Sequence, residues 1–115
     1  MTELRGFQKL PLTTSKDLTA GALSYTTSIG RRFRIAQILV HTDVAITETV
    51  TITIDSKQGA NYDTVLVSWD MVGETDWRFV PDGDTVFYPG DELKVQVTNA
   101  NTTGTVYVEI KLLEA

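Results

Sequence analysis

Alternation of apolar and polar side chains is the clearest signal along this chain. In residues 48–55, valine and isoleucine alternate with threonine, which is the two-residue period of a β-strand with one buried face. The same alternation recurs in residues 92–99 and 105–112, and the Asn- and Gly-containing segment 99–104 between them predicts a hairpin. The pattern therefore predicts several half-buried strands.

Other segments extend this interpretation. Residues 33–40 are apolar on both faces, as expected of a central strand. Residues 62–71 alternate, and this places Trp69 on an inner face with Val65 and Val67, in the expected core. Shorter or weaker strand candidates are residues 5–12, 22–26, 76–80 and 85–88. Turn signals about every ten residues then predict an all-β, antiparallel β-sandwich or barrel of about eight strands.

Composition supports a single β-rich domain. Threonine, valine and isoleucine together account for 37 of the 115 residues, and such β-branched side chains fit a pleated surface better than a helix. In residues 1–19, Pro11 and the polar run 13–17 predict an N-terminal arm and linker, and residues 20–115 are expected to form the β-sandwich domain. The absence of cysteine excludes disulfides, thiolate catalysis and cysteine-ligated metals.

Charge limits the classes of partner. The net charge of −5 argues against a general nucleic-acid binder. No apolar run approaches the length that spans a membrane, and the N-terminus lacks the pattern of a secretory signal, so we expect synthesis and retention in the cytoplasm or release without export. Residues 1–34 carry a balance of +4 and the remainder −9, which favours association between surfaces of opposite sign, including copies of this chain.

Candidate catalytic and metal-binding residues are few. His41 is the only histidine, and no nucleophile motif surrounds Ser24, Ser28, Ser56 or Ser68, so packing at a strand end or exposure to solvent is the favoured interpretation. Acidic residues gather in the middle of the sequence and could hold Ca²⁺ or act as a glycosidase pair, although turn formation explains them more simply; they are Asp70, Glu74, Asp76, Asp82, Asp84 and Asp91. We expect no cofactor and no enzymatic activity.

Aromatic side chains raise the alternative of a carbohydrate-binding module. Trp77, Tyr88 and Tyr107 are the candidates for an outer face on which sugar rings could stack. A core or oligomer-interface role for these rings is the favoured interpretation. A small hydrolase that uses the acidic residues is a third, weaker hypothesis.

The order of segments also resembles a known class of protein. Residues 25–41, the Thr-rich strand through Asp55, the Pro-Gly-Asp turn and strand of residues 87–99, and the closing strand of residues 104–113 carry the resemblance. Their layout is similar to that of the small jelly-roll or β-sandwich structural proteins of tailed bacteriophages, which include capsid decoration, head-fibre and tail-accessory modules. The resemblance implies a jelly-roll-like fold and a non-enzymatic structural role on a virion, in contact with other virion proteins, after synthesis in the host cytoplasm.

The divided charge leads to a prediction about assembly. An isologous contact would place like charges together, whereas a heterologous ring places one subunit's basic patch on the next subunit's acids. We therefore predict a cyclic homo-oligomer, with a trimer as the first choice. The residues expected at the contact are the basic Arg5, Lys9, Arg31, Arg32 and Arg34, the apolar Phe7, Leu10 and Leu12, and the acidic Asp82, Asp84 and Asp91.

Overall fold

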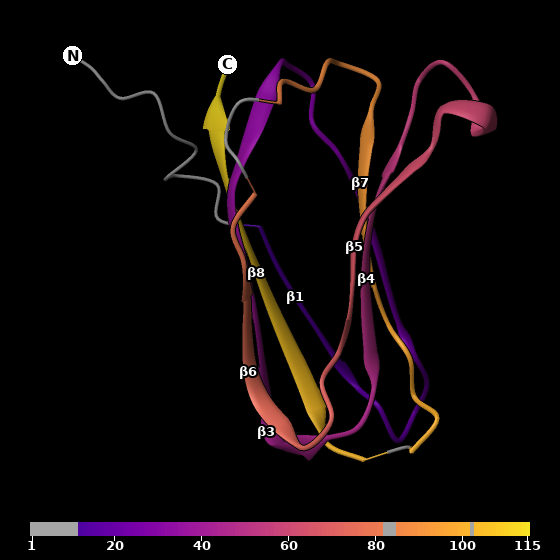
Figure 1. Cartoon of the computed structure of the whole chain (residues 1–115), viewed down its shortest axis with the longest axis vertical. Helices are drawn as coiled ribbons and strands as arrows, with labels where there is room; N and C mark the ends of the chain where they lie inside the picture. Colours follow the sequence, from indigo (N-terminus) through magenta and orange to yellow (C-terminus); the bar gives the residue numbers. More distant parts are fainter. Residues whose placement is uncertain (1–11, 82–84, 102) are drawn as a thin grey trace.

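Two β-sheets packed face to face make up the structure, a computed structural model that describes residues 12–81, 85–101 and 103–115 (Figure 1). The strands are β1 (Leu12–Asp17), β2 (Leu23–Ser28), β3 (Phe33–Ile46), β4 (Thr49–Asp55), β5 (Thr64–Asp70), β6 (Glu74–Phe79), β7 (Glu92–Val97) and β8 (Thr105–Glu114). One short 3-10 turn, η1 (Ala60–Tyr62), lies between β4 and β5. None of the helical turns in these ranges is long and apolar enough to cross a membrane.

Strand order identifies the topology as a jelly roll. The first sheet has the order β1-β8-β3-β6 and the second has the order β2-β7-β4-β5. All neighbouring strands are antiparallel, and β1 pairs with β8, β2 with β7, β3 with β6 and β4 with β5. The first four strands thus pair with the last four in reverse order, like one long antiparallel hairpin. This hairpin folds over to form two four-stranded layers, as in other jelly rolls. The predicted all-β sandwich of about eight strands is confirmed.

The core lies between the sheets and follows the predicted alternation. Val50, Ile52 and Ile54 of β4 are buried, as are the inward residues of β7 and β8. Phe33 at the start of β3 is the largest fully buried side chain, and its ring packs against Phe87 with centroids 5.3 Å apart. Complete burial of side chains of this size stabilises the fold by about 1.5–3 kcal/mol each.

The hairpin predicted for residues 92–112 is wrong. β7 pairs with β2 and β4 in the second sheet, whereas β8 pairs with β1 and β3 in the first. Alternation specifies which side chains point inward, but both strands have the same inward pattern whichever sheet they join. Residues 98–104 therefore cross from one sheet to the other, and we call them the crossover loop.

A buried carboxylate anchors the crossover loop. Glu48 is only 2% exposed and accepts hydrogen bonds from the Thr98 hydroxyl at 2.7 Å and from the backbone N–H groups of Ala100 and Asn101 at 2.9 and 2.7 Å. Burial by itself would raise the pKa of Glu48, but these hydrogen bonds outweigh it and hold the pKa below its ordinary value. The link between β3 and β4 thereby fixes a loop that lies far along the chain.

The boundary predicted for the N-terminal arm also needs correction. Residues 12–17, which were assigned to an arm and linker, form the edge strand β1 and pair along their whole length with β8. The alternation of half-buried and exposed positions in β1 is carried by threonine, serine and lysine, so hydrophobicity alone did not reveal it. The predicted arm residues before Leu12 lie outside the described residues.

Two smaller expectations were also wrong. Trp69 is 40% exposed and does not lie in the core, because β5 is an edge strand whose inward side chains are only partly covered. A strand over residues 85–88 is reduced to one bridge, between Phe87 and Phe33. The weaker candidate at residues 22–26, in contrast, corresponds to β2.

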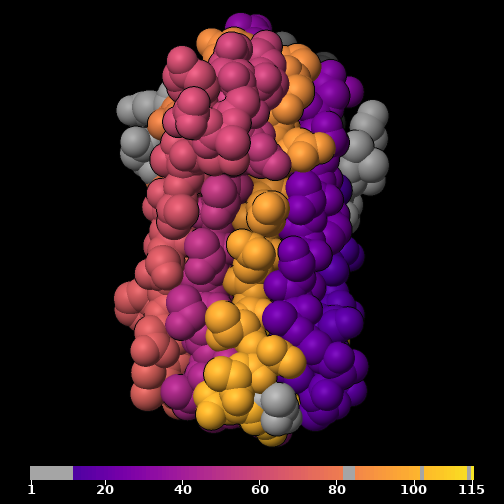
Figure 2. Space-filling view, turned by 90° about the vertical axis from the view of Figure 1, so that its right-hand side faces the viewer, coloured from indigo at the N-terminus to yellow at the C-terminus, as the bar shows by residue number. Residues whose placement is uncertain are grey.

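The outer face of the second sheet carries mostly small polar side chains. Figure 2 shows this face with β5, β4, β7 and β2 running side by side. One row across it consists of Ser68, Thr51, Gln96 and Ser24. The outer face of the first sheet is different and contains larger charged and aromatic side chains.

Candidate functional site

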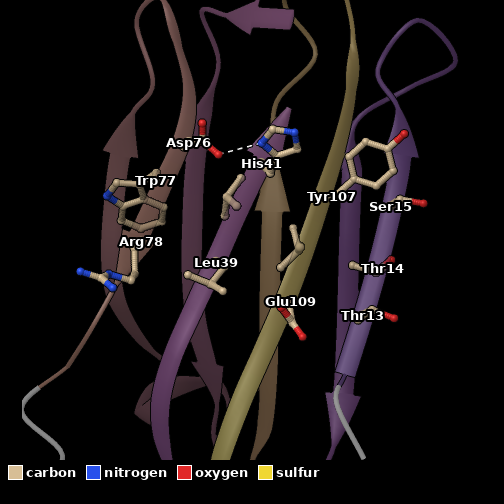
Figure 3. Close-up of a pocket in the computed structure, with 12 residues that line it drawn as sticks. Thr13, Thr14, Ser15, Leu39, His41, Asp76, Trp77, Arg78, Tyr107 and Glu109 are labelled. Atoms are coloured by element: carbon tan, nitrogen blue, oxygen red, sulfur yellow. Dashed lines mark hydrogen bonds and ion pairs between the residues drawn. The ribbon is translucent and has the colours of Figure 1, made fainter. Parts of the chain in front are cut away.

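An open groove of about 870 Å³ crosses the outer face of the first sheet (Figure 3). Two neighbouring rows of side chains form its floor, because directly paired residues of antiparallel strands point to the same face. The first row consists of Ser15, Tyr107, His41 and Asp76. The second row consists of Thr13, Glu109, Leu39 and Arg78. All four strands of the sheet thus contribute side chains to one surface.

A histidine–aspartate pair forms one end of the first row. His41 Nδ1 donates to Asp76 Oδ1 at 2.7 Å, and the Thr75 hydroxyl donates to the other carboxylate oxygen at 2.9 Å. Both hydrogen bonds lower the pKa of Asp76 below its ordinary value, and the hydrogen bond from His41 has the larger effect. Because a carboxylate only accepts, the Nδ1 atom carries the proton of this hydrogen bond. The pair therefore presents a ring in a fixed orientation.

Tyr107 lies in the middle of the same row. Its side chain is 47% exposed, and its ring centroid lies 6.3 Å from that of His41. The second row places the carboxylate of Glu109 and the guanidinium of Arg78 on the two sides of Leu39. The groove therefore offers an aromatic surface surrounded by hydrogen-bond donors and acceptors.

The three candidate ligand residues do not lie together. Tyr107 is on the groove floor, but Trp77 pairs with buried Val40 and points toward the interior. Tyr88 lies in a turn near the Lys57 ammonium group, which is 5.9 Å from the centre of its ring. Tyr107 and Trp77 therefore both line the groove, although the Trp77 ring packs on the core, and Tyr88 lies outside it.

The side of the sandwich between β5 and β6, here called the open flank, is a second notable surface. These strands are the edges of different sheets, and Trp69 of β5 stacks on Trp77 of β6 with centroids 6.0 Å apart and planes 3° from parallel. The indole N–H of Trp69 donates to Glu74 at 2.9 Å. The two indole rings thus connect the sheets where no strand closes them.

A cavity of about 540 Å³ lies at the open flank, toward one end of the sandwich. Its apolar lining includes Leu66 of β5, Phe79 of β6 and Phe87. Asp55 and Glu92 lie next in the chain to lining residues, and they face each other directly on β4 and β7. Like charges in such a position destabilise a sheet unless a cation approaches them. The wall of the cavity is thus apolar, whereas the acidic pair follows the buried pair of Ile54 and Leu93 and points to the outer face of the second sheet.

The predicted contact residues are distributed over several regions. Six of them lie outside the described residues: Arg5, Phe7, Lys9, Leu10, Asp82 and Asp84. Leu12 is half-buried in β1, Arg31 and Arg32 are exposed before β3, and Arg34 is half-buried in β3. Asp91 is buried and accepts the backbone N–H groups of Lys57 and Tyr88, each at 3.0 Å. Asp91 therefore has a role within its own turn.

Sequence reasoning did not find the groove. His41 was expected to pack at a strand end or to be exposed to solvent; it is exposed, but it lies in the middle of β3, which continues to Ile46. Its partner Asp76 was grouped with acids that could bind Ca²⁺, yet no cluster of three or more acidic or histidine side chains suited to a metal occurs among the described residues. The pairing of β3 with β6 brings the two together, and no local motif encodes it.

Comparisons with known proteins give no family. No protein-family model matches this sequence, and a search of curated proteins finds no match. Among solved structures, the core of Drosophila NLP, described with pentamer formation and histone binding, is 13% identical, with 90% of this chain and 98% of that chain covered and a TM-score of 0.44.

A second similar structure is that of the CBM22-1 and GH10 modules of Clostridium thermocellum xylanase 10B in complex with xylohexaose. It is 12% identical, with 96% of this chain aligned and a TM-score of 0.44. This chain spans about a quarter of it, since 26% of the xylanase chain is covered. Both likenesses are too distant to assign a function.

Proposed function

We propose that this protein is a non-enzymatic structural protein of a virion that assembles into a cyclic homo-oligomer. In this proposal, the residues before β1 of one subunit bind the cavity at the open flank of the next. The observation that carries the proposal is the apolar cavity between two unpaired sheet edges, because exposed apolar surface of this kind is typical of protein–protein contacts.

The positions of the arm and the cavity favour a head-to-tail contact. Leu12 lies in one row across the first sheet with Ile110, Ile38 and Phe79, so the arm starts at the level of the cavity wall. β1 and β6 are opposite edges of that sheet. A subunit placed beside another in the same orientation therefore brings its arm to its neighbour's cavity, and repetition of such a contact can close a ring.

The chemistry of the arm is complementary to this site. Phe7 and Leu10 can cover Leu66, Phe79 and Phe87, and burial of each is worth about 1.5–3 kcal/mol. The jelly-roll topology is consistent with a virion role, since capsid proteins commonly use it. A trimer remains the proposed size.

The test is deletion of residues 1–11, which keeps β1 intact. We expect light scattering after size exclusion to show a lower mass for the truncated chain with an unchanged β-type circular dichroism spectrum. Replacing both Phe7 and Leu10 by aspartate should have the same effect, and Gln8→Asp is the matched control that keeps the mass of the full chain. A truncated chain that retains the full mass would overturn the arm contact.

The virion role needs its own measurement. Purified particles of a phage whose genome encodes this chain should contain it in several copies, as quantified by mass spectrometry. Particles that lack the protein would remove the virion assignment and leave the oligomer prediction to be judged on mass alone.

A further inference from the structure

We infer that the groove on the outer face of the first sheet binds a neutral oligosaccharide. This site is separate from the arm and the open flank, and it is built from two rows of paired residues that were described above (Figure 3). The inference does not depend on the proposed function.

The size and openness of the groove fit an extended ligand. Its volume of about 870 Å³ lies within the range of small-molecule sites. It crosses four strands, and at about 4.8 Å per interval between strands the floor is about 14 Å long. The ligand is therefore a chain of sugar rings that extends across the strands.

The lining chemistry selects a polyol. A sugar ring has apolar C–H faces and hydroxyl groups around its edge, so it needs an aromatic surface with donors and acceptors beside it. Tyr107 supplies the exposed ring, and the imidazole of His41 extends this aromatic surface. The guanidinium of Arg78 donates, and the carboxylate of Glu109 accepts. Hydroxyl groups of Ser15 and Thr13 can do both.

The charge of the groove argues against other ligands. Two carboxylates, of Asp76 and Glu109, stand against the single guanidinium of Arg78, so a phosphate chain or nucleic acid would be repelled. Both rows also contain charged side chains, which are depleted at the centre of the surfaces that hydrophobic partners cover. An uncharged ligand rich in hydroxyl groups matches this set of side chains best.

The hydrogen bond between His41 and Asp76 fixes the orientation of the imidazole ring before a ligand binds. Because Asp76 holds Nδ1 at 2.7 Å and is itself held by Thr75, the imidazole has a defined orientation. A pre-oriented group loses little conformational freedom on binding. His41 and Asp76 are therefore assigned as positioning residues, and Tyr107 as the main contact.

The experiment uses the full chain on an array of neutral, sulfated and carboxylated oligosaccharides, followed by calorimetric titration with the neutral oligosaccharide that binds best. We expect Tyr107→Ala to weaken binding at least tenfold, Tyr107→Phe to retain most of it, and Tyr62→Ala to leave it unchanged. Tyr62 is the matched control because it is an exposed tyrosine outside the groove. Circular dichroism verifies that each variant is folded.

Three results would overturn the inference. They are no binding to any neutral glycan on the array, binding that is confined to sulfated or carboxylated glycans, and binding that persists in Tyr107→Ala. A chain with residues 1–11 deleted should still bind the oligosaccharide, so that failure of the arm contact and failure of the groove are distinguished.

Discussion

Glu48 and Asp76 are both carboxylates held by hydrogen bonds, but they lie in opposite surroundings. Glu48 is buried at one end of the sandwich and accepts hydrogen bonds from the crossover loop, whereas Asp76 is exposed at the end of the groove and accepts from a neighbouring side chain. Hydrogen bonding lowers the pKa of both groups. The difference teaches that hydrogen bonding to a carboxylate anchors a loop at one position and holds an exposed imidazole at the other.

Removal of the Glu48 carboxylate should have the largest effect on stability. Glu48→Ala leaves the Thr98 hydroxyl and the backbone N–H groups of Ala100 and Asn101 without their acceptor, at a cost of about 3 kcal/mol. Urea denaturation measures this loss. Glu109→Ala is the matched control on the exposed groove floor and should change the free energy of unfolding by less than about 0.5 kcal/mol. Equal effects of the two variants would mean that Glu48 does not anchor the loop.

The pH dependence of the free energy of unfolding tests the same prediction in a second way. The pKa of Glu48 in the folded state is below its ordinary value of 4.5, so its contribution is fully present above that value and is lost as the pH falls through the folded pKa. The stability difference between the natural chain and Glu48→Gln should therefore shrink below about pH 4.5. A difference that stays constant down to pH 3 would contradict a role for the negative charge.

The other end of the crossover loop should show the next largest effect. Gly104 has φ of +81°, and a Cβ atom there would lie 2.7 Å from Val44 Cγ2 and 3.1 Å from Asp43 Oδ1. Gly104→Ala should therefore destabilise the protein by about 2 kcal/mol in thermal or urea denaturation. Gly30→Ala is the control, since no atom lies within 4 Å of its added Cβ, and it should be nearly neutral. A neutral Gly104→Ala would show that the loop is free to move.

The smallest effect on stability is expected in the groove. His41→Ala should leave the urea midpoint unchanged because both members of the pair are exposed. The pKa of Asp76 should rise toward its ordinary value of 3.8, since the hydrogen bond from His41 is the main cause of its depression. Carbon-13 NMR titration of the carboxyl groups measures this rise, and the pKa of Glu48 should not move. An unchanged Asp76 pKa would show that Thr75 alone sets it.

The sequence pattern predicted which face of a strand is buried better than it predicted which strands pair with each other. Alternation in residues 48–55 correctly placed Val50, Ile52 and Ile54 in the core, because burial of one face imposes a period of two. The same reasoning could not assign β7 and β8 to different sheets, since that choice depends on their pairing with strands far away in the chain, β7 with β4 and β8 with β3. The local pattern thus indicates which side chains are buried, whereas the order of the strands depends on contacts between distant residues.

The candidate site depended even more on topology. His41 and Asp76 are 35 positions apart, and they meet only because β3 and β6 pair with His41 opposite Asp76. Tyr107 was recognised as an exposed aromatic, but its neighbours in the groove come from three other strands. The exposure of Trp77 stayed open because a short strand between charged residues did not reveal which face would be buried, and the structure packs Trp77 against the core. A surface assembled from four strands leaves no motif in any one of them.

The placement of β8 has a consequence for how the chain is made. β8 follows every other strand in the chain, yet it lies inside the first sheet, between β1 and β3. Until β8 leaves the ribosome, β1 has no partner in its sheet and one edge of β3 remains open. Contacts between such distant segments form slowly, and open strand edges bind other chains in the meantime. A low level of expression should therefore favour soluble protein over aggregates, because fewer unfinished chains are present to bind one another.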